Sequence, residues 1–398
     1  MKAVILVAGE GTRMRPLTTT RPKVMLPIAN KSILEHIVDA SVDAGINEFV
    51  FITGYFRDSI KEHFKDGKKW GRDIKIKYVH QAQQRGTADA IGCARDYVDG
   101  RFVVLNGDVL ISSDYLKNLI LRDGDAVLTV KEVEDPSNFG VIETKGGKVT
   151  KIMEKPEDPP TNLANAGIYL FADSIFDFID KTTLSGRGEL EITDSLQMMI
   201  DSGADVGYNI LEHNWIDVGR PWDMLYANEL LLQDIKANCH GLVEPNATLI
   251  GEVVVGEGTL IRNGAYIIGP VVIGNDCDIG PNCFIRPATS IGNGVRIGNA
   301  VEVKNSIIMD NTNIGHLSYV GDSIIGQNCN LGAGTKVANL RHDGKTIRVT
   351  LGCKFLDSGR RKLGVIMGDG VHTAINTSIN VGSVIESGGF TKPGEVVR

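Results

Sequence analysis

The 398-residue sequence lacks several features that mark other protein classes. No apolar run approaches the roughly 18 residues of a membrane-spanning helix, and Met1 leads directly into an aliphatic segment rather than a secretory leader. Lysine and arginine form no long run, and the net charge of -7 argues against a nucleic-acid partner. We therefore expect a cytoplasmic protein with neither a nucleic-acid nor a membrane partner.

The six cysteines also lack the CxxC spacing that metal and redox sites use. Cys277 and Cys283 lie six residues apart, at equivalent small positions of neighbouring repeats. We expect buried core thiols rather than disulfides or zinc ligands.

A six-residue period runs through the second half of the sequence. Every sixth residue from Val243 to Met309 is aliphatic, twelve positions in all, and the positions four residues further on are small or branched. Glycine or asparagine commonly fills the turn between them. Such hexapeptide repeats predict a left-handed parallel β-helix, in which three repeats form a triangular coil and the aliphatic side chains point inward.

Strands and helices alternate through the first half. The expected strands cover residues 2–7, 48–53, 75–79 and 101–105, and the expected helices cover 33–44, 59–64 and 87–96. This order predicts a doubly wound, Rossmann-like α/β domain with ligands at the carboxyl ends of its strands. We expect an amphipathic helix that starts at Pro221 to connect the two domains. The expected domains are 1–228, a linker at 229–241, and the β-helix at 242–398.

A glycine-rich loop follows the first expected strand. Gly9 and Gly11 let the backbone turn its N–H groups toward an anion, and Arg13, Arg15 and Lys23 can neutralise a triphosphate. The spacing fits neither the GxGxxG of dinucleotide-binding proteins nor the GxxxxGK[ST] of P-loop ATPases. The loop therefore predicts a different kind of polyphosphate site.

The segment from Gly9 to Lys23 resembles the GxGTRLxPLTxxxPK signature of nucleoside-diphosphate-sugar pyrophosphorylases, with Met14 at the usual leucine. The resemblance covers nearly all of residues 1–228. It implies catalytic roles for Arg13 and Lys23. The implied nucleotide-binding residues are Leu6, Ala8, Gly9, Gly11, Thr12, Gln81, Gly86 and Thr87. Among them, the Gln81 amide offers one donor and one acceptor to the edge of uracil or thymine, which implies UTP or dTTP as substrate.

Attack of a sugar 1-phosphate on a triphosphate joins two polyanions, so it needs cations and a metal ion. Asp108 at the end of a strand and Asp217 in a Trp-Ile-Asp-Val-Gly turn are hard oxygen ligands of the kind that Mg²⁺ prefers. They match the two metal-binding aspartates of the family. On the sugar side the resemblance implies Gly140, Glu154, Lys155 and Asn165, of which Lys155 would meet the phosphate.

The second half resembles, in order along the chain, the acetyltransferase half of bifunctional N-acetylglucosamine-1-phosphate uridylyltransferase/glucosamine-1-phosphate acetyltransferases, with a layout like the archaeal versions. The matching segments are 286–287, 301–306, 315–322 and 330–335. His316, which we expect to break the hexapeptide phase, would be the base that takes a proton from the substrate ammonium. The implied substrate-binding residues are Arg286, Lys304, Tyr319, Asn330, Asn339 and Lys345, with Ala333 near acetyl-CoA. Residues 345–363 interrupt the repeats, and the basic stretch at 358–362 within them is a candidate for binding the 3′-phosphate of coenzyme A.

The sequence thus predicts a homotrimeric, Mg²⁺-dependent enzyme that forms UDP-N-acetylglucosamine. It would transfer acetyl from acetyl-CoA to glucosamine 1-phosphate, and uridylyl from UTP to N-acetylglucosamine 1-phosphate. One alternative is a glucose-1-phosphate thymidylyltransferase with a scaffolding β-helix, which shares the N-terminal motifs. The other is a non-catalytic regulatory subunit, a class that tends to lose the loop cations and metal aspartates present here.

Overall fold

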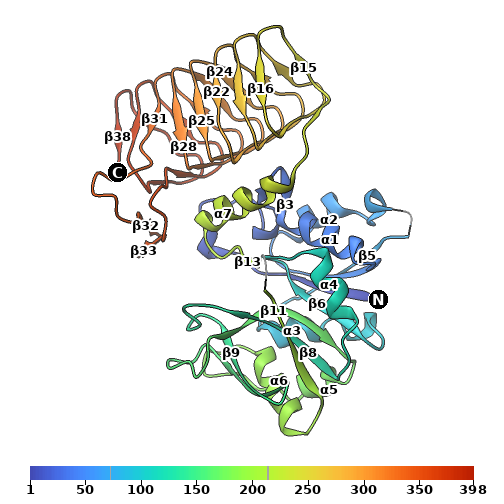
Figure 1. Ribbon diagram of the computed structural model, residues 1–398. Helices are drawn as coiled ribbons and strands as arrows, with labels where there is room; N and C mark the ends of the chain where they lie inside the picture. Colours follow the sequence, from blue (N-terminus) through green and yellow to red (C-terminus); the bar gives the residue numbers. More distant parts are fainter. Residues whose placement is uncertain (72, 213–214) are drawn as a thin grey trace. The chain divides into compact units, whose positions relative to one another are not determined.

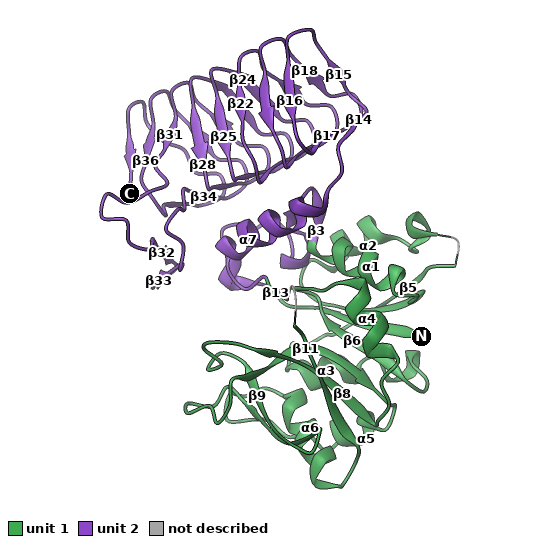
Figure 2. Ribbon diagram, in the orientation of Figure 1, with its two compact units in different colours: residues 1–10, 33–217 green, residues 11–32, 218–398 purple. Residues whose placement is uncertain are grey.

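The computed structural model describes residues 1–71, 73–212 and 215–398. These residues form two compact units, drawn in different colours in Figure 2. Unit 1 comprises residues 1–10 and 33–217, and unit 2 comprises residues 11–32 and 218–398. The predicted division of the chain at residue 228 stays a prediction.

Unit 1 is built on a nine-stranded sheet in the order β5-β4-β1-β6-β11-β8-β12-β10-β9 (Figure 1). Its strands are β1 (Lys2–Val7), β4 (Glu48–Thr53), β5 (Lys75–His80), β6 (Phe102–Asn106), β8 (Ala126–Glu132), β9 (Gly140–Lys145), β10 (Lys148–Glu154), β11 (Leu163–Phe171) and β12 (Val206–Ile210). The first four in this order are parallel, and β11 runs antiparallel to both of its main neighbours. The parallel half confirms the doubly wound α/β prediction.

Six α-helices accompany this sheet among the described residues of unit 1. They are α1 (Ile33–Asp43), α2 (Arg57–Phe64), α3 (Thr87–Gly92), α4 (Ser113–Ile120), α5 (Ile175–Ile179) and α6 (Ile192–Asp201). The helix expected at 87–96 is shorter than predicted. It ends at Gly92, a weak helix former, and a 3₁₀ turn at Arg95–Tyr97 follows.

Unit 2 contains three parallel sheets that follow one another along the chain in every coil. Sheet I contains β14 (Asn238–Cys239), β17 (Val253–Val255), β20 (Val271–Ile273), β23 (Thr289–Ile291), β26 (Ile307–Ile308), β29 (Ile324–Ile325), β34 (Ile366–Met367) and β37 (Val384–Ile385). Sheet II contains β15 (Leu242–Val243), β18 (Leu260–Ile261), β21 (Asp278–Ile279), β24 (Arg296–Asn299), β27 (Asn313–His316), β30 (Asn330–Leu331) and β35 (His372–Thr373). Sheet III contains β16 (Thr248–Ile250), β19 (Tyr266–Ile268), β22 (Phe284–Ile285), β25 (Glu302–Lys304), β28 (Tyr319–Gly321), β31 (Lys336–Val337), β36 (Ser378–Ile379) and β38 (Val396–Val397). This arrangement is the predicted parallel β-helix.

Unit 2 also holds elements outside the coils. They are β2 (Pro27–Ile28), β3 (Lys31–Ser32), the helix α7 (Pro221–Leu231), and an antiparallel hairpin of β32 (Arg348–Leu351) and β33 (Lys354–Asp357). The hairpin confirms that the repeats are interrupted in this region. We name the turns by the sheets they join: the I–II corner, the II–III corner and the III–I corner.

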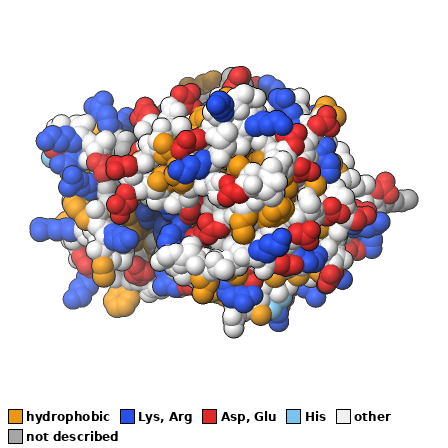
Figure 3. Space-filling view, turned by 90° about the horizontal axis from the view of Figure 1, so that it is seen from below, with side chains coloured by type: hydrophobic (Ala, Val, Ile, Leu, Met, Phe, Trp, Pro, Cys, Tyr) orange, Lys and Arg blue, Asp and Glu red, His pale blue; other side chains and the backbone are white. Residues whose placement is uncertain are grey.

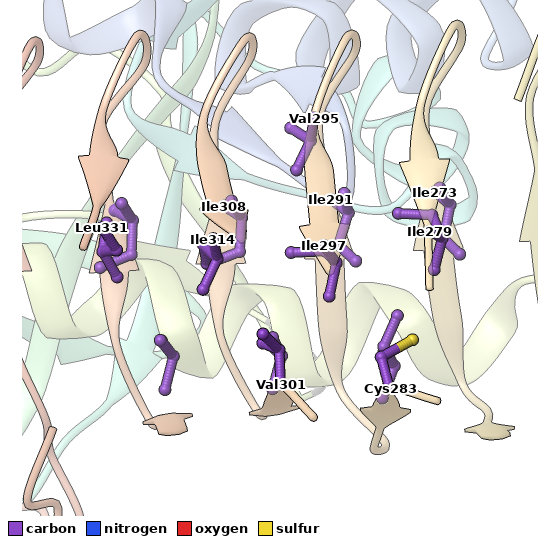
Figure 4. Packing of buried hydrophobic residues seen from close by; sticks show 14 of the residues in the cluster. Ile273, Ile279, Cys283, Ile291, Val295, Ile297, Val301, Ile308, Ile314 and Leu331 are labelled. Atoms are coloured by element: carbon purple, nitrogen blue, oxygen red, sulfur yellow. The ribbon is translucent and has the colours of Figure 1, made fainter. Parts of the chain in front are cut away.

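The interior of the β-helix is a continuous stack of aliphatic side chains. Figure 4 shows Ile279, Ile297, Ile314 and Leu331 in one row, contributed by successive coils. Ile279 pairs with Ile297, eighteen residues on, whereas Ile297 pairs with Ile314 and Ile314 with Leu331, seventeen residues on in each case. The coils therefore shorten by one residue partway along the stack.

This shortening corrects two predictions. The inward residue after Val303 is Ile308, five residues on, and Met309 is buried but lies outside the stacked core. The missing residue falls at a tight III–I corner, where Asn305 takes a left-handed conformation (φ 45°). His316 does not break the phase, because its coil steps six residues from Ile314 to the next inward residue.

The stack is less regular at its first coil. Val243, expected to point inward, is 36% exposed. Its strand β15 is an edge strand that pairs, among the described strands, only with β18, so one side of the first coil is uncovered. Val243 nevertheless pairs with the inward Ile261, so the inward prediction holds for its register, and the uncovered end of the stack accounts for its exposure.

The cysteines of the β-helix differ in burial. Cys277, Cys283 and Cys329 are buried free thiols, and burial raises the pKa of the Cys283 thiol to about 12. That shift keeps the thiol protonated at neutral pH and confirms the core assignment of this residue. Cys239 and Cys353 are exposed instead.

Surface charge is mixed on the face that Figure 3 shows, where acidic and basic side chains are interspersed. Attraction for an anion would then come from local groups of cations rather than from a broad field over this face. No helix among the described residues has the length and apolar character needed to cross a lipid bilayer.

Candidate active sites

The two aspartates predicted to bind metal are brought together by a short pairing of two strands. Asp108 follows β6 at its carboxyl end and directly precedes β7 (Val109–Leu110). β7 pairs antiparallel with β13 (Ile216–Asp217), and Asp217 lies opposite Val109. Residues more than a hundred positions apart thus occupy adjacent register positions at one strand end. Both aspartates take part in interactions within the protein.

The predicted nucleotide-binding residues of unit 1 gather at the same edge of the parallel strands. The Gly107 N–H donates to the Leu6 oxygen at 3.0 Å, and the Gln84 amide donates to the Ala8 oxygen at 2.5 Å. Gly54 passes so close that a Cβ atom there would lie 2.8 Å from the Ala8 oxygen. Glycine is therefore required directly after the neighbouring strand β4 for this packing.

The Gln81 side chain is buried and held within the protein. Its Nε2 atom donates to Asp89 Oδ2 at 2.8 Å, and Arg85 grips the other oxygen of Asp89 at 2.6 Å. The second N–H of this amide donates to the Gly86 oxygen at 3.4 Å. Reading a base with both a donor and the acceptor of the amide would therefore require Gln81 to release one of these two contacts. The sequence signalled neither Asp89 nor this restraint.

Gly86 and Thr87 fasten the start of α3 to the segment before α6. A Cβ atom at Gly86 (φ 124°) would lie 2.4 Å from the Leu190 oxygen, so no other residue fits there. The Thr87 hydroxyl oxygen accepts a hydrogen bond from the Ile192 N–H at 3.0 Å. These contacts give both residues a structural role whatever ligand they meet.

The four predicted sugar-binding residues form one cluster. Glu154 pairs with Gly140 across β10 and β9, and a Cβ atom at Gly140 would lie 3.2 Å from Glu154 Oε2 and 3.4 Å from the Asn165 Cβ. Lys155 donates its N–H to the Phe139 oxygen at 3.0 Å, and its Nζ lies 3.6 Å from Glu154 Oε1. The Asn165 amide donates to the buried Tyr169 hydroxyl at 2.7 Å.

Sequence reasoning missed the partners that set the charge of this cluster. Arg187 lies 3.1 Å from Glu154 and 3.4 Å from Glu191. Burial, followed by the nearby Glu154, raises the pKa of Glu191 and the pKa of Asp194. The carboxyl groups of Glu154, Glu189 and Glu191 lie within 3.9 Å of the Arg187 guanidinium. They form a site suited to polyhydroxylated ligands, since carboxylates accept hydrogen bonds from hydroxyls.

The predicted cations of the phosphate loop belong to unit 2. Gly11 (φ 68°) packs against Lys23, because a Cβ atom at Gly11 would lie 2.8 Å from the Lys23 Cβ. Lys23 is buried, whereas Thr12 and Arg13 are exposed. The Thr18 hydroxyl donates to the Gly11 oxygen at 2.9 Å, which closes the loop.

Arg220 and Asp223, at the start of α7, extend this cationic group and were missed by sequence reasoning. Burial and the charge of Arg13 lower the pKa of Arg220. Burial raises the pKa of Asp223 to about 6, even though backbone hydrogen bonds and the charges of Lys23 and Arg220 oppose that shift. The Arg220 N–H donates to Asp223 Oδ2 at 2.6 Å. Unit 2 thus contains three cations near one carboxyl group.

In the β-helix, several predicted acetyl-transfer residues meet at the III–I corner. Asp322, which is 1% exposed, accepts hydrogen bonds from Lys304 at 3.2 Å and from Asn339 at 2.5 Å. Asn339 also donates to the Tyr319 hydroxyl at 3.1 Å. Arg286, at the same corner of an earlier coil, pairs with Glu302 at 2.9 Å. Asp322 organises the group, a role that sequence reasoning did not give it.

A pocket of about 450 Å³ opens beside this group. Its lining residues are Glu229, Pro287, Ala288, Lys304, Asn305, Asp322, Arg360, Arg361 and Lys362. The Arg360 guanidinium lies 2.5 Å from Glu229 on α7, so the basic stretch after the hairpin folds back over this corner. The pocket contains four cations and two carboxylates, a balance that suits an anion.

The other predicted residues lie elsewhere in the β-helix. His316 is exposed at the II–III corner, where the Gly334 N–H donates to the His316 oxygen at 3.2 Å, so Ala333 and His316 belong to stacked turns. Asn330 is exposed on sheet II, and Lys345 is exposed in the turn before the hairpin. The III–I and II–III corners flank strand β28, which at three residues spans about 10 Å.

Comparisons with known proteins agree with both halves of this description. The family described as nucleotidyl transferase matches residues 2–234, and the family described as GMPPB C-terminal domain matches residues 267–388. The "Bifunctional protein GlmU" of Methanocaldococcus jannaschii is 44% identical, over 97% of this chain and 92% of its own length. The "Bifunctional sugar-1-phosphate nucleotidylyltransferase/acetyltransferase" of Sulfurisphaera tokodaii is 39% identical over 100% of this chain and 97% of its own.

Two solved structures resemble the first part of the chain. A putative glucose-1-phosphate thymidylyltransferase from Bacillus anthracis, in complex with a sucrose, has a TM-score of 0.54 and 31% identity, covering 60% of this chain and 97% of its own. A UDP-glucose pyrophosphorylase complexed with UDP-glucose has a TM-score of 0.53 and 27% identity, covering 58% of this chain and 98% of its own.

Proposed function

We propose the substrates and site residues of this chain from one premise: it belongs to the family of bifunctional sugar-1-phosphate nucleotidylyltransferases/acetyltransferases. As a member it is an enzyme that takes sugar-phosphate and nucleotide substrates. The proposed products are N-acetylglucosamine 1-phosphate, made from acetyl-CoA and glucosamine 1-phosphate, and UDP-N-acetylglucosamine, made from UTP. The names of the full-length relatives support the pairing of the two activities.

The observation that carries nucleotidyl transfer is the β7–β13 pairing, which sets Asp108 beside Asp217. Family enzymes generally use a divalent metal, and two carboxylates that no thiol or imidazole joins among the described residues fit Mg²⁺ better than softer ions. No cluster of three or more His, Cys, Asp and Glu is present among the described residues, so substrate oxygens and water would complete the coordination. When bound, Mg²⁺ neutralises phosphate charge.

The protein residues in this reaction bind and orient the substrates. Arg13 and Lys23 would hold the triphosphate while an oxygen of the sugar 1-phosphate attacks the α-phosphorus. A new P–O bond forms, the bond to the β-phosphate breaks, and pyrophosphate leaves. Glu154 and Asn165 would accept and donate hydrogen bonds at the sugar ring, and Lys155 would contact its phosphate.

Acetyl transfer is supported by the Asp322 group and by the exposed His316 about one short strand away. Lys304, which shares the pocket with Arg360, would hold the sugar phosphate together with Arg286 of an earlier coil. His316 would take a proton from the substrate ammonium, after which the amine attacks the thioester carbonyl. A C–N bond forms, the C–S bond breaks, and the coenzyme A thiol leaves. Tyr319, Asn330 and Asn339 would contact the sugar or the thioester, and Ala333 the pantetheine.

A homotrimer is part of this proposal, because a triangular prism presents flat faces on which further chains can pack around a threefold axis. Light scattering of the purified protein tests it directly. A mass of three chains is expected. A monomer that still transfers acetyl groups would contradict the trimer.

A substrate panel tests the function itself. Acetyl-CoA with glucosamine 1-phosphate should release free thiol, and UTP with N-acetylglucosamine 1-phosphate and Mg²⁺ should release pyrophosphate. The panel also includes dTTP with glucose 1-phosphate, since one structural neighbour is a putative thymidylyltransferase. Thiol release near background would reject the acetyl-transfer proposal. A tenfold preference for dTTP and glucose 1-phosphate would reject the uridylyl proposal.

A further inference from the structure

The loop that carries Arg13 and Lys23 is anchored on the β-helix. Residues 11–32 belong to the same compact unit as the coils, and both are drawn in one colour in Figure 2. The anchor is Asp369, at the I–II corner after β34. Its Oδ2 atom accepts hydrogen bonds from Arg21 at 2.5 Å and from the Thr20 hydroxyl.

Asp369 is itself fixed by the coils. Its Oδ1 atom accepts a hydrogen bond from the Gln327 N–H at 2.9 Å, one coil earlier. Its own N–H donates to the Ser387 hydroxyl at 3.2 Å, and that hydroxyl donates to the Pro16 oxygen at 3.4 Å. The coils before and after that of Asp369 thus set the position of the carboxylate that receives Arg21.

A second anchor holds the far end of the same loop. The Asn30 amide donates to the Ile291 oxygen of sheet I at 2.6 Å. Asn228 of α7, which is fully buried, accepts from the Ala29 N–H at 2.8 Å and donates to the Ala288 oxygen at 3.0 Å. The 3₁₀ turn Lys23–Met25 lies between the two anchors in sequence.

The outer face of sheet I, where these anchors lie, is covered in the later coils. Outward residues of sheet I in the later coils, Ile307, Ile324 and Ile366, are at most 1% exposed, whereas the outward Asn313 and Asn330 of sheet II are exposed. The Arg21 and Asp369 side chains are 15% and 10% exposed. An ion pair in such surroundings is screened much less by salt than one on the surface.

We propose that Asp369 is a positioning residue for nucleotidyl transfer. Its carboxylate pairs with the Arg21 guanidinium and so fixes the backbone two residues before Lys23. The β-helix thereby sets the position of the Lys23 ammonium that meets the triphosphate. The inference rests on the proposed role of Lys23. Displacement of a catalytic group by about 1 Å can cost about 10²-fold in rate. Release of Arg21 also frees a further cation that competes with Arg13 and Lys23 for the phosphates.

Kinetics of pyrophosphate release test this inference with four variants. Asp369→Ala should lower kcat about 10- to 100-fold, with little change in the KM of the sugar 1-phosphate. Arg21→Ala should give a similar loss, and the double variant should lose no more than the larger single effect, because the two residues act as one unit. Glu386→Gln, which removes an exposed charge at the same corner one coil later, is the matched control.

A readout independent of turnover accompanies the kinetics. Hydrogen exchange at residues 17–26 should become faster in Asp369→Ala, while exchange in the stacked coils and the melting temperature change little. Acetyl transfer, where wild type shows it, should stay within twofold.

Two outcomes overturn the inference. One is Asp369→Ala activity within twofold of wild type while Lys23→Ala is inactive. The other is losses in Asp369→Ala and Arg21→Ala that multiply in the double variant. If Lys23→Ala retains activity, the proposed role of Lys23 fails, and faster exchange in Asp369→Ala then still reports whether the anchor exists.

Discussion

The two sets of proposed site residues reach their places by different structural devices. In unit 1, the strand topology brings the residues together, because the parallel strands end at one edge of the sheet and the β7–β13 pairing places Asp217 beside Asp108. In the β-helix, the register of the coils brings the residues together, because residues one coil apart meet at a corner, as Lys304 and Asp322 do. The first device tolerates changes in distant loops. The second depends on the length of every coil.

The largest expected effect concerns the β-helix site. His316→Ala should lower acetyl transfer by about 10²- to 10⁴-fold, because the substrate ammonium then loses its proton acceptor. Pyrophosphate release should stay within twofold of wild type. Thiol release from acetyl-CoA measures the first activity. If acetylation survives within about threefold, below the range for a general base, His316 is a turn residue and the corner carries no catalysis.

The next effect concerns unit 1. Asp108→Asn should lower nucleotidyl transfer by about 10²- to 10³-fold, since it removes one of the two charges proposed to hold the metal. The matched variant Asp114→Asn changes an exposed aspartate in the first turn of α4 and should be silent. Pyrophosphate release measured over a Mg²⁺ titration is the assay. Equal losses of both activities in a folded Asp108→Asn protein would contradict separate sites.

A third experiment sharpens the role of register. Ile308→Gln should destabilise the protein by about 3 to 5 kcal/mol, because it places an unpaired amide in the aliphatic stack. Met309→Gln should cost about 1 kcal/mol, since Met309 lies outside the stack with its sulfur 3.9 Å from the Arg21 guanidinium, a donor for an amide oxygen. Chemical denaturation of both variants compares them. If Met309→Gln destabilised the protein more than Ile308→Gln, the result would support the unbroken six-residue period, which places Met309 inward.

The smallest effect depends on pH. The pKa of Asp223, raised to about 6, lies above the ordinary aspartate value of 3.8. Between these values the folded state binds the proton and the unfolded state does not, so stability falls as pH rises from about 4 to 6. On acidification from pH 7 to pH 4, the free energy of unfolding of wild type should rise by at most about 3 kcal/mol relative to that of Asp223→Asn. A difference between the two proteins that does not vary with pH would contradict the buried carboxyl.

Much of the fold follows from local pattern. The strands expected at 2–7 and 48–53 are observed at those bounds, because continuous aliphatic runs between turns leave little choice. The β-helix follows from its period. The period did not reveal the five-residue step after Val303, since a tight corner at Asn305 depends on one left-handed residue. The doubled pairs Ile307–Ile308 and Ile324–Ile325 were the available signal, because they mark strands buried on both faces.

The site residues divide in the same way. Motif matching named Asp108 and Asp217, and four sugar-side residues, and the structure brings the members of each group together. It did not find Arg187, Asp223 or Asp322, because their importance comes from partners distant in sequence. Burial of a charged group is visible only once the chain is folded.

One mixing experiment tests the central claim that the chain carries two independent active sites. His316→Ala and Asp108→Asn are each incubated with glucosamine 1-phosphate, acetyl-CoA, UTP and Mg²⁺, and then as a mixture. Each variant alone should form almost no UDP-N-acetylglucosamine. The mixture should form it at a substantial fraction of the wild-type rate, because N-acetylglucosamine 1-phosphate made by one protein is consumed by the other. A mixture that stays inactive, from two folded variants, would contradict the two-site account.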